Sequence, residues 1–234
     1  MNKDLLVNVS INPEVNADIQ GRDLVNRYSF KEELFNSITH GVGALFSIAA
    51  LVVLVAFSSI KGDVWRIVSF SIYGATLFLL YLFSTLYHSI CVEKAKKVLR
   101  VFDHASIYLL IAGSYTPIAL VAMRGTWGWS IFAVVWSLAL LGIVLNIISI
   151  EKTKKLSTVL YVLMGWLIIV AIKPMLQMVP HGLFVCLLIG GLIYTLGVIF
   201  YLCRKIPFNH GIWHLFVLGG SVIHYLGFLF YLAL

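Results

Sequence analysis

The chain has 234 residues, of which 61% are hydrophobic and 12% are charged, and its formal net charge is +7. Soluble domains contain about 45–50% apolar and about 25% charged residues, so this composition excludes an ordinary soluble fold and favours a protein solvated by lipid. The positive charge does not indicate nucleic-acid binding, because basic residues gather in the cytoplasmic loops of membrane proteins for topological reasons.

The first thirty-odd residues are polar and lack the short apolar core of a secretory signal peptide. We therefore expect residues 1–33 to form a cytoplasmic N-terminal tail and residues 34–234 to form the transmembrane domain. The chain has only three cysteines, Cys91, Cys186 and Cys203, and this number does not indicate a disulfide framework.

Apolar segments long enough to cross a membrane follow one another along the rest of the chain. About 20 apolar residues in a helix span the hydrocarbon core, and seven segments meet this requirement: roughly 37–60, 66–90, 104–123, 128–150, 157–179, 182–203 and 210–233. They are too long and too uniformly apolar for barrel strands. The sequence therefore predicts an all-α integral membrane protein, a seven-transmembrane helix bundle.

The connections between these segments are alternately rich and poor in lysine and arginine. Thirteen of the 17 lie in the N-terminal tail and in the second, fourth and sixth connections, whereas the opposite side holds Lys61, Arg66, Arg124 and Lys173. In membrane proteins the cytoplasmic connections carry the excess of basic residues. This distribution predicts a cytoplasmic N-terminus and an extracytoplasmic C-terminus.

The ionisable and polar residues of the predicted spans gather at the cytoplasmic side. They are Glu33, Asn36 and His40 around the start of the first span, Ser84 and His88 near the end of the second, Asp103 and His104 at the start of the third, and His210 and His214 at the start of the seventh. Ionisable residues in membrane spans are costly and usually functional. We expect these residues to converge on one site.

Two of the histidines have the spacing of a metal-binding pair. His210 and His214 are four residues apart and share a helix face, and His88 from another helix would complete a set of three nitrogens. Three histidines with an open position are typical of catalytic zinc, Zn2+, which activates water near neutral pH. Asp103 is then placed to hold or deprotonate the water, and Ser84 to hydrogen-bond the water or a developing oxyanion.

Other interpretations of these residues remain open. Histidines in membrane helices also form interhelical hydrogen bonds without any metal. Cys91 and Cys203 lie on the cytoplasmic side as rival zinc ligands, although a set of three histidines needs neither. His104 is rotated by about 100° from Asp103 around the helix and is expected to face elsewhere. His224, about 15 Å beyond the histidine pair, is expected deep in the bundle, as a packed polar residue or a cavity contact.

A family resemblance rests on the same residues. The pattern consists of Glu33, Asn36 and His40, then Ser84 and His88, Asp103, the run Gly113-Ser114-Tyr115-Thr116-Pro117, His210 and His214, and finally Gly220, Ser221 and His224. In this pattern the chain resembles the bacterial hemolysin III branch of the PAQR family, the relatives of progestin and adiponectin receptors. The resemblance covers essentially the whole chain after about residue 30.

This resemblance implies a seven-helix protein of the bacterial cell (inner) membrane. It implies zinc held by His88, His210 and His214, with Asp103 at the zinc-bound water and Ser84 nearby. The family is grouped with alkaline ceramidases among metal-dependent membrane hydrolases, which implies membrane lipids as substrates or ligands and a role in lipid homeostasis. The three matching residues of the first span either close the cytoplasmic rim or assist the site.

Three functions are consistent with these observations. The first is a zinc-dependent amidase or esterase that acts on a lipid from within the bilayer, and an open metal position beside a lipid-sized cavity would favour it. The second is a non-enzymatic membrane sensor or receptor, which a metal ligated entirely by protein would favour. The third is a cytolytic pore, which needs a continuous polar path, and the outer halves of the spans offer few polar residues for one.

Overall fold

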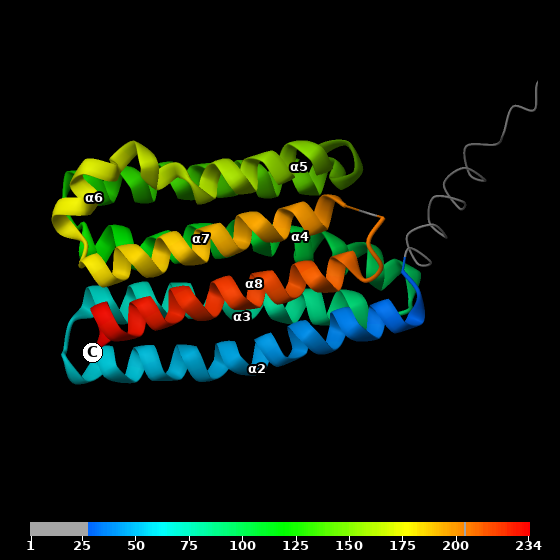
Figure 1. The fold of residues 1–234 in the computed structure, drawn as a ribbon, viewed down its shortest axis with the longest axis horizontal. Helices are drawn as coiled ribbons and strands as arrows, with labels where there is room; N and C mark the ends of the chain where they lie inside the picture. Colours follow the sequence, from blue (N-terminus) through cyan, green and yellow to red (C-terminus); the bar gives the residue numbers. More distant parts are fainter. Residues whose placement is uncertain (1–27, 204) are drawn as a thin grey trace, which may run out of the picture.

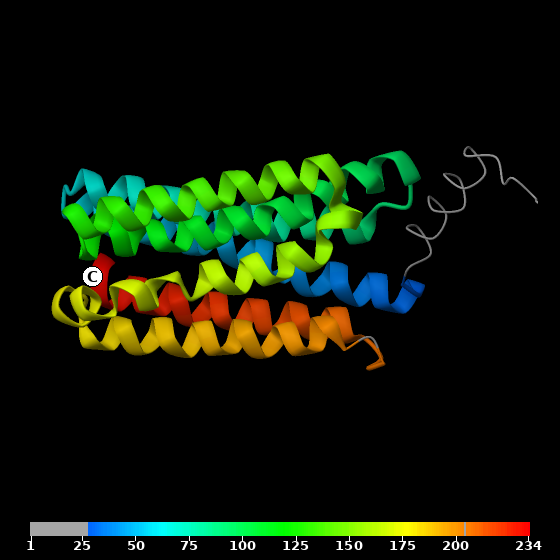
Figure 2. The same ribbon diagram turned by 90° about the horizontal axis from the view of Figure 1, so that it is seen from above.

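The computed structural model describes residues 28–203 and 205–234, and all elements assigned in those two ranges are helical. The expected tail, residues 1–33, lies mostly outside the described residues. In chain order the elements are α2 (Phe30–Ile60), α3 (Val64–Ser89), α4 (Glu93–Pro117), η1 (Ile118–Ala122), α5 (Thr126–Gly165), η2 (Leu167–Ala171), α6 (Ile172–Met178), α7 (His181–Leu202), α8 (Asn209–Phe228) and η3 (Leu229–Ala233). The long helices lie along one axis and form an elongated bundle (Figures 1 and 2).

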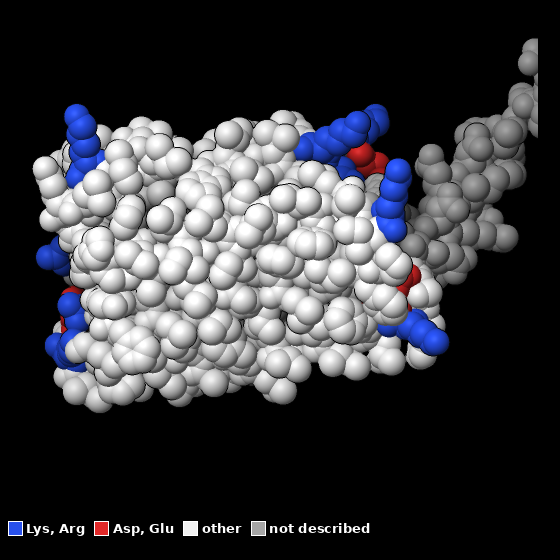
Figure 3. Space-filling model, viewed as in Figure 1, with Lys and Arg blue, Asp and Glu red and all other residues white. Residues whose placement is uncertain are grey.

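Six helical segments of the described residues are long and apolar enough to cross a membrane: Phe30–Ile60, Val64–Ser89, Glu93–Ala122, Thr126–Met178, His181–Leu202 and Asn209–Ala233. Apolar side chains cover their outer surface, for example Leu45, Ile147 and Val170, which are 72%, 64% and 78% exposed. On the face shown in Figure 3, charged residues gather at the two ends of the bundle and leave a broad uncharged belt between them. Such a continuous apolar surface is stable in lipid rather than in water, so the chain is an all-α, multi-pass membrane protein.

The longest of these segments contains a break. α5 is interrupted at Ser149, whose φ of −167° and ψ of 97° are not helical, and two helices meet there. The chain turns back at this point, so the two arms of the segment run in opposite directions (Figure 2). The hydroxyl of Ser157 stabilises the turn by donating a hydrogen bond to Asn146 Oδ1 at 2.9 Å. The two spans expected at 128–150 and 157–179 fall on these two arms.

Two helices begin earlier than the apolar runs indicate. α2 begins at Phe30 and α4 at Glu93, whereas the expected spans begin near residues 37 and 104. A capping box fixes the first turn of α2: the backbone N–H of Glu32 donates to Ser29 Oγ at 3.3 Å, and the backbone N–H of Ser29 donates to Glu32 Oε2 at 2.9 Å. These early turns extend the helices with polar residues that become part of the site.

Three helices that carry site residues are joined in the middle of the bundle. α2 and α3 approach closely at Gly43, where a Cβ atom would lie 2.5 Å from Cδ1 of Tyr81. The buried Tyr81 hydroxyl donates to Ser221 Oγ on α8 at 2.8 Å. Its ring packs edge-on against His40 of α2, with ring centroids 5.0 Å apart. Tyr81 of α3 therefore contacts both α2 and α8.

The candidate residues share one end of the bundle. The start of α2, the connection from α3 to α4, the turn in α5 and the connection from α7 to α8 all lie at that end, on the right in Figure 1. α6 and the C-terminus lie at the other end (Figures 1 and 2). The structure therefore gives the candidate residues the common depth that the alternation of spans predicts.

Candidate metal centre

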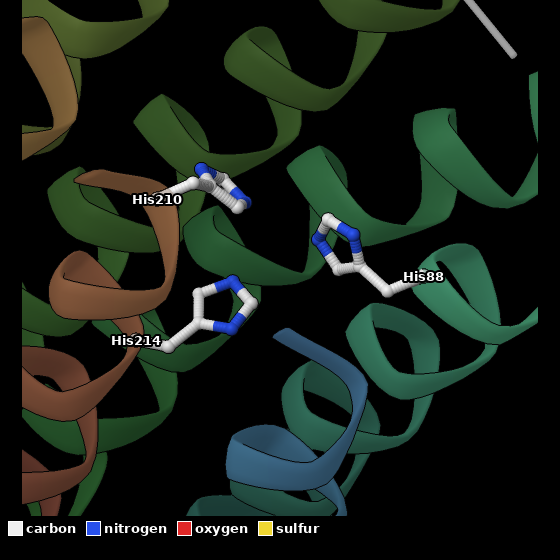
Figure 4. Close-up of side chains that lie close together, drawn as sticks. All are labelled: His88, His210 and His214. Atoms are coloured by element: carbon white, nitrogen blue, oxygen red, sulfur yellow. The ribbon is translucent and has the colours of Figure 1, made fainter. Parts of the chain in front are cut away.

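Three buried histidines from two helices form a compact cluster. His88 comes from the last turn of α3, and His210 and His214 come from successive turns of α8. One ring nitrogen from each lies within 4.8 Å of the others. The three rings point toward one another (Figure 4). The cluster is the one that the sequence predicts from the spacing of its histidines.

A tight chain turn brings the α8 histidines into place. The residue before α8, Phe208, has a left-handed backbone with a φ of 55° and a ψ of 21°. Such a conformation is strained by about 1–2 kcal/mol for a residue with a side chain. The side-chain amide of Asn209 donates to the carbonyl of Phe200 at 3.1 Å and ties the turn to the end of α7. As a result His210 lies in the first turn of α8, facing the bundle.

Residues of α2 fix the ring orientations of two histidines. Glu33 Oε2 accepts a hydrogen bond from His88 Nδ1 at 2.5 Å. His214 Nδ1 donates to the backbone carbonyl of Asn36 and to the hydroxyl oxygen of Thr39, both at 3.2 Å. When Nδ1 of an imidazole carries the proton, Nε2 is left with a lone pair that can bind a metal. These hydrogen bonds from α2 leave Nε2 of both rings available to a metal ion.

The ring nitrogens that remain are suited to a cation. In the described part of the chain, His88 Nε2 and both ring nitrogens of His210 are buried without a hydrogen-bond partner. Zinc–nitrogen bonds are about 2.0–2.1 Å long, so three nitrogens on one ion lie within about 4 Å of one another. The three nitrogens of this cluster lie within 4.8 Å of one another, so a small movement of the side chains brings them to the distances that zinc requires. The donor set and its geometry therefore fit zinc.

Asp103 and Ser84 share a cavity with two of these histidines. The cavity has a volume of about 230 Å³. Its lining includes His40, Ser84, Asp103, His104, His210 and His214, together with further polar side chains such as Thr158, Tyr194 and His224. The hydroxyl of Ser84 is buried and has no hydrogen-bond partner among the described residues. A carboxylate, a hydroxyl and two imidazoles of the candidate metal cluster thus line one common space.

His104 differs from its expected position. It was expected to face away from Asp103, but it lines the same cavity, and its Nδ1 lies 3.4 Å from Asp103 Oδ2. The same nitrogen donates to the backbone carbonyl of Arg100 at 3.0 Å. A rotation of 100° between neighbours on a helix still allows both side chains to border a cavity this wide. His104 therefore belongs to the surroundings of the Asp103 carboxylate.

Two other candidates lie close to the cluster or deeper in the cavity. His40 stacks on His214, with ring centroids 3.5 Å apart and planes inclined by 14°. His224 lines the inner part of the cavity and its Nε2 donates to the carbonyl of Leu187 at 3.2 Å, so both of the roles considered for it are present. Cys91 and Cys203 are exposed, and neither belongs to the metal-ligand group found among the described residues.

Sequence reasoning missed three residues at this site. Thr39 contacts His214, Lys96 forms an ion pair with Glu33 at 2.7 Å, and Tyr28 stacks on His210 with ring centroids 5.3 Å apart. Thr39 lies three residues after Asn36, so its helical spacing was an available signal. Lys96 belonged to the basic residues that were counted for topology alone.

Comparison with known proteins places the chain among membrane proteins of one family. Residues 28–225 match the family model described as haemolysin-III related. Hemolysin-3 of Bacillus cereus is 52% identical over 202 residues, covering 86% of this chain and 92% of that protein. The Hemolysin-3 homolog of Bacillus subtilis (strain 168) is 50% identical over 204 residues, covering 87% and 96%.

More distant similarity extends to animals. The human monocyte to macrophage differentiation factor is 30% identical over 200 residues, which cover 83% of this chain and 82% of that protein. The region matched by the family model, residues 28–225, contains all three histidines of the cluster as well as Glu33 and Asp103. The chain belongs to the haemolysin-III-related family, in agreement with the resemblance in its motifs.

Proposed function

We propose that this protein is a zinc-dependent hydrolase that cleaves an amide or ester bond of a membrane lipid. The proposal rests mainly on one observation: His210, His214, Asp103 and Ser84 all line the same cavity. A structural metal needs only ligands. A hydrolytic site also needs a base and a hydrogen-bond donor beside the metal, and both are present here.

Each of these side chains has a role in the proposed reaction. Bound zinc supplies Lewis-acid polarisation of a carbonyl and activation of water. Asp103 accepts the proton of the attacking water and delivers it to the leaving amine or alcohol. Its Oδ2 lies 3.4 Å from the Nδ1 of His104. Ser84 donates a hydrogen bond to the oxygen on which negative charge develops.

The rest of the cavity is suited to an acyl chain. Most of its other lining side chains are apolar, for example Ile107, Leu110, Ile168, Met175 and Val198. A volume of about 230 Å³ is many times the roughly 15 Å³ that one water molecule requires. An apolar space that ends at a polar cluster is complementary to a lipid, with its chain in the cavity and its carbonyl at the metal.

The proposed topology places this chemistry at the cytoplasmic side of the bacterial cell membrane. The two arms of Thr126–Met178 would cross the membrane separately, which gives seven spans with the N-terminus inside and the C-terminus outside. The reversal at Ser149 and the excess of basic residues at the same end of the bundle support this topology. A lipid would then reach the site from the inner leaflet.

Metal content tests the ligand assignment. Purified wild-type protein is expected to contain about one zinc ion per chain, and His210→Ala and His214→Ala are expected to lose most of it, because each removes one of three ligands. His181→Ala is the matched control, since His181 is exposed at the opposite end of the bundle. Atomic absorption on the four proteins makes the comparison. Zinc retained at the wild-type level in both ligand variants would contradict the assignment.

Lipid turnover tests the proposed activity. Wild-type protein in mixed micelles is expected to release fatty acid from at least one member of a panel of ceramides and phospholipids. Asp103→Asn is expected to keep its zinc and lose turnover by about 100-fold or more, because the proton acceptor is gone. Mass spectrometry of the released fatty acid provides the measurement. Zinc-loaded wild-type protein that turns over none of the panel would favour the sensor with structural zinc.

Thiol labelling tests the topology. Cys91 and Cys203 are exposed near the site end of the bundle, and Lys173 is exposed near the other end. In intact cells, a membrane-impermeant maleimide is expected to label a single-cysteine Lys173→Cys protein and to spare proteins that retain only Cys91 or only Cys203. Permeabilised cells serve as the control for reactivity. The reverse pattern would invert the proposed orientation.

A further inference from the structure

Lys96 differs from the other basic residues near the site end of the bundle. It was assigned to a connection between spans, yet it lies in the first turn of α4, and its side chain is only 5% exposed. Its neighbour Lys97 has a side chain that is 45% exposed and pairs with Glu93 of the same helix at 2.7 Å. Lys97 behaves as an ordinary surface lysine. The burial of Lys96 therefore needs another explanation.

The buried ammonium group is linked to the metal cluster through one carboxylate. Lys96 Nζ donates to Glu33 Oε1 at 2.7 Å, and the other oxygen of the same carboxylate, Oε2, accepts from His88 Nδ1 at 2.5 Å. The side chain of His88 is completely buried and that of Glu33 is 12% exposed. Three helices, α4, α2 and α3, thus contribute one residue each to a continuous chain of hydrogen bonds that ends on a metal ligand.

This arrangement has a physical cost that a purely structural contact does not require. Moving a lysine and a glutamate out of water costs several kcal/mol for each ion, and a buried ion pair is often no more stable than apolar residues of similar size. By contrast, a carboxylate bonded to the second nitrogen of a metal-ligating histidine fixes the tautomer and raises the basicity of the ligand. Lys96 holds that carboxylate in position through its hydrogen bond to Oε1.

We propose that Lys96 is a positioning residue for the metal site that acts through Glu33 on His88. The Lys96–Glu33 pair keeps the proton of His88 on Nδ1 and presents Nε2 to the cluster. The pair also couples metal binding to the approach of α4, the helix that carries Asp103. This inference rests on the proposed zinc site. It adds to that site a lysine that had been used only to predict the membrane orientation from the sequence.

The competing explanation is a structural latch between α2 and α4. Tyr87 lies near the ammonium group, with its ring centroid 5.2 Å from Lys96 Nζ, so loss of Lys96 could loosen the end of the bundle without any specific effect on the metal. A latch would change the unfolding temperature of the metal-free protein. A positioning residue changes the affinity and the electronic environment of the metal, and it does so only while Glu33 is present.

The test is a double-mutant cycle on metal binding. Lys96→Met, Glu33→Gln and the double variant are purified as full-length proteins, with Lys97→Met as the matched control and Lys96→Arg as the conservative replacement. Zinc affinity is measured by competition with a chelator. The visible absorption spectrum of the cobalt-substituted proteins reports on ligand geometry, and thermal unfolding of the metal-free proteins reports on the fold.

Glu33→Gln is expected to weaken zinc binding by about 10–100-fold, the usual effect of removing an outer-shell partner. Lys96→Met is expected to weaken binding and to shift the cobalt spectrum, Lys96→Arg to restore both, and Lys97→Met to leave both unchanged. In the Glu33→Gln background, Lys96→Met should have little further effect, because residues that act through one another are not additive.

Two results would overturn the inference, and a third would overturn its premise. Lys96→Met with wild-type affinity and spectrum would exclude a positioning role. A lower unfolding temperature of the metal-free Lys96→Met protein, together with a cobalt spectrum like that of the wild type, would favour the latch. If the wild-type protein bound neither zinc nor cobalt, the assignment of the metal site itself would be wrong. This outcome differs from the other two because the Lys97→Met control would also bind no metal.

Discussion

A polar group that is buried away from water must find a hydrogen-bond partner. This constraint explains how the histidine side chains are arranged at the site end of the bundle. Each imidazole of the cluster has two nitrogens to satisfy. For His88 and His214, one nitrogen is bonded to residues of α2. The other nitrogen of His88, and both nitrogens of His210, are buried with no partner in the part of the chain that the structure describes. The lone pair that each of these two rings retains is therefore available to the proposed zinc ion.

Helix α2 has a central role in this arrangement although it contributes no ligand to the cluster. Its first three turns carry Glu33, Asn36, Thr39 and His40, and these residues contact the histidines of α3 and α8 by hydrogen bonds or ring stacking. The first-span residues were expected either to close the rim or to assist the site. Their contacts are with the cluster itself, and the Lys96–Glu33 pair extends them to α4. The proposed ligands, the proposed base and their hydrogen-bond partners therefore come from four different helices, α2, α3, α4 and α8.

Much of the site could be predicted from the sequence because its signals are local. The four-residue spacing of His210 and His214 and the alternation of spans were enough to bring the three histidines together. Hydropathy failed at the helix ends, since α2 and α4 continue into polar turns that an apolar run does not detect. There Lys96, Arg100 and Asp103 follow helical spacing, as do Glu33, Asn36 and His40. Lys96 and Glu33 are 63 residues apart in the sequence. The spacing of residues within one helix cannot predict which polar faces of two different helices pair.

The central claim is that His88, His210 and His214 hold zinc and leave a coordination position open toward the cavity. X-ray absorption at the zinc edge of the purified wild-type protein tests it most directly. The account predicts a first shell of three imidazole nitrogens and one oxygen at about 2.0–2.1 Å, with no sulfur. Sulfur at about 2.3 Å, or fewer than three imidazoles in the first shell, would contradict it.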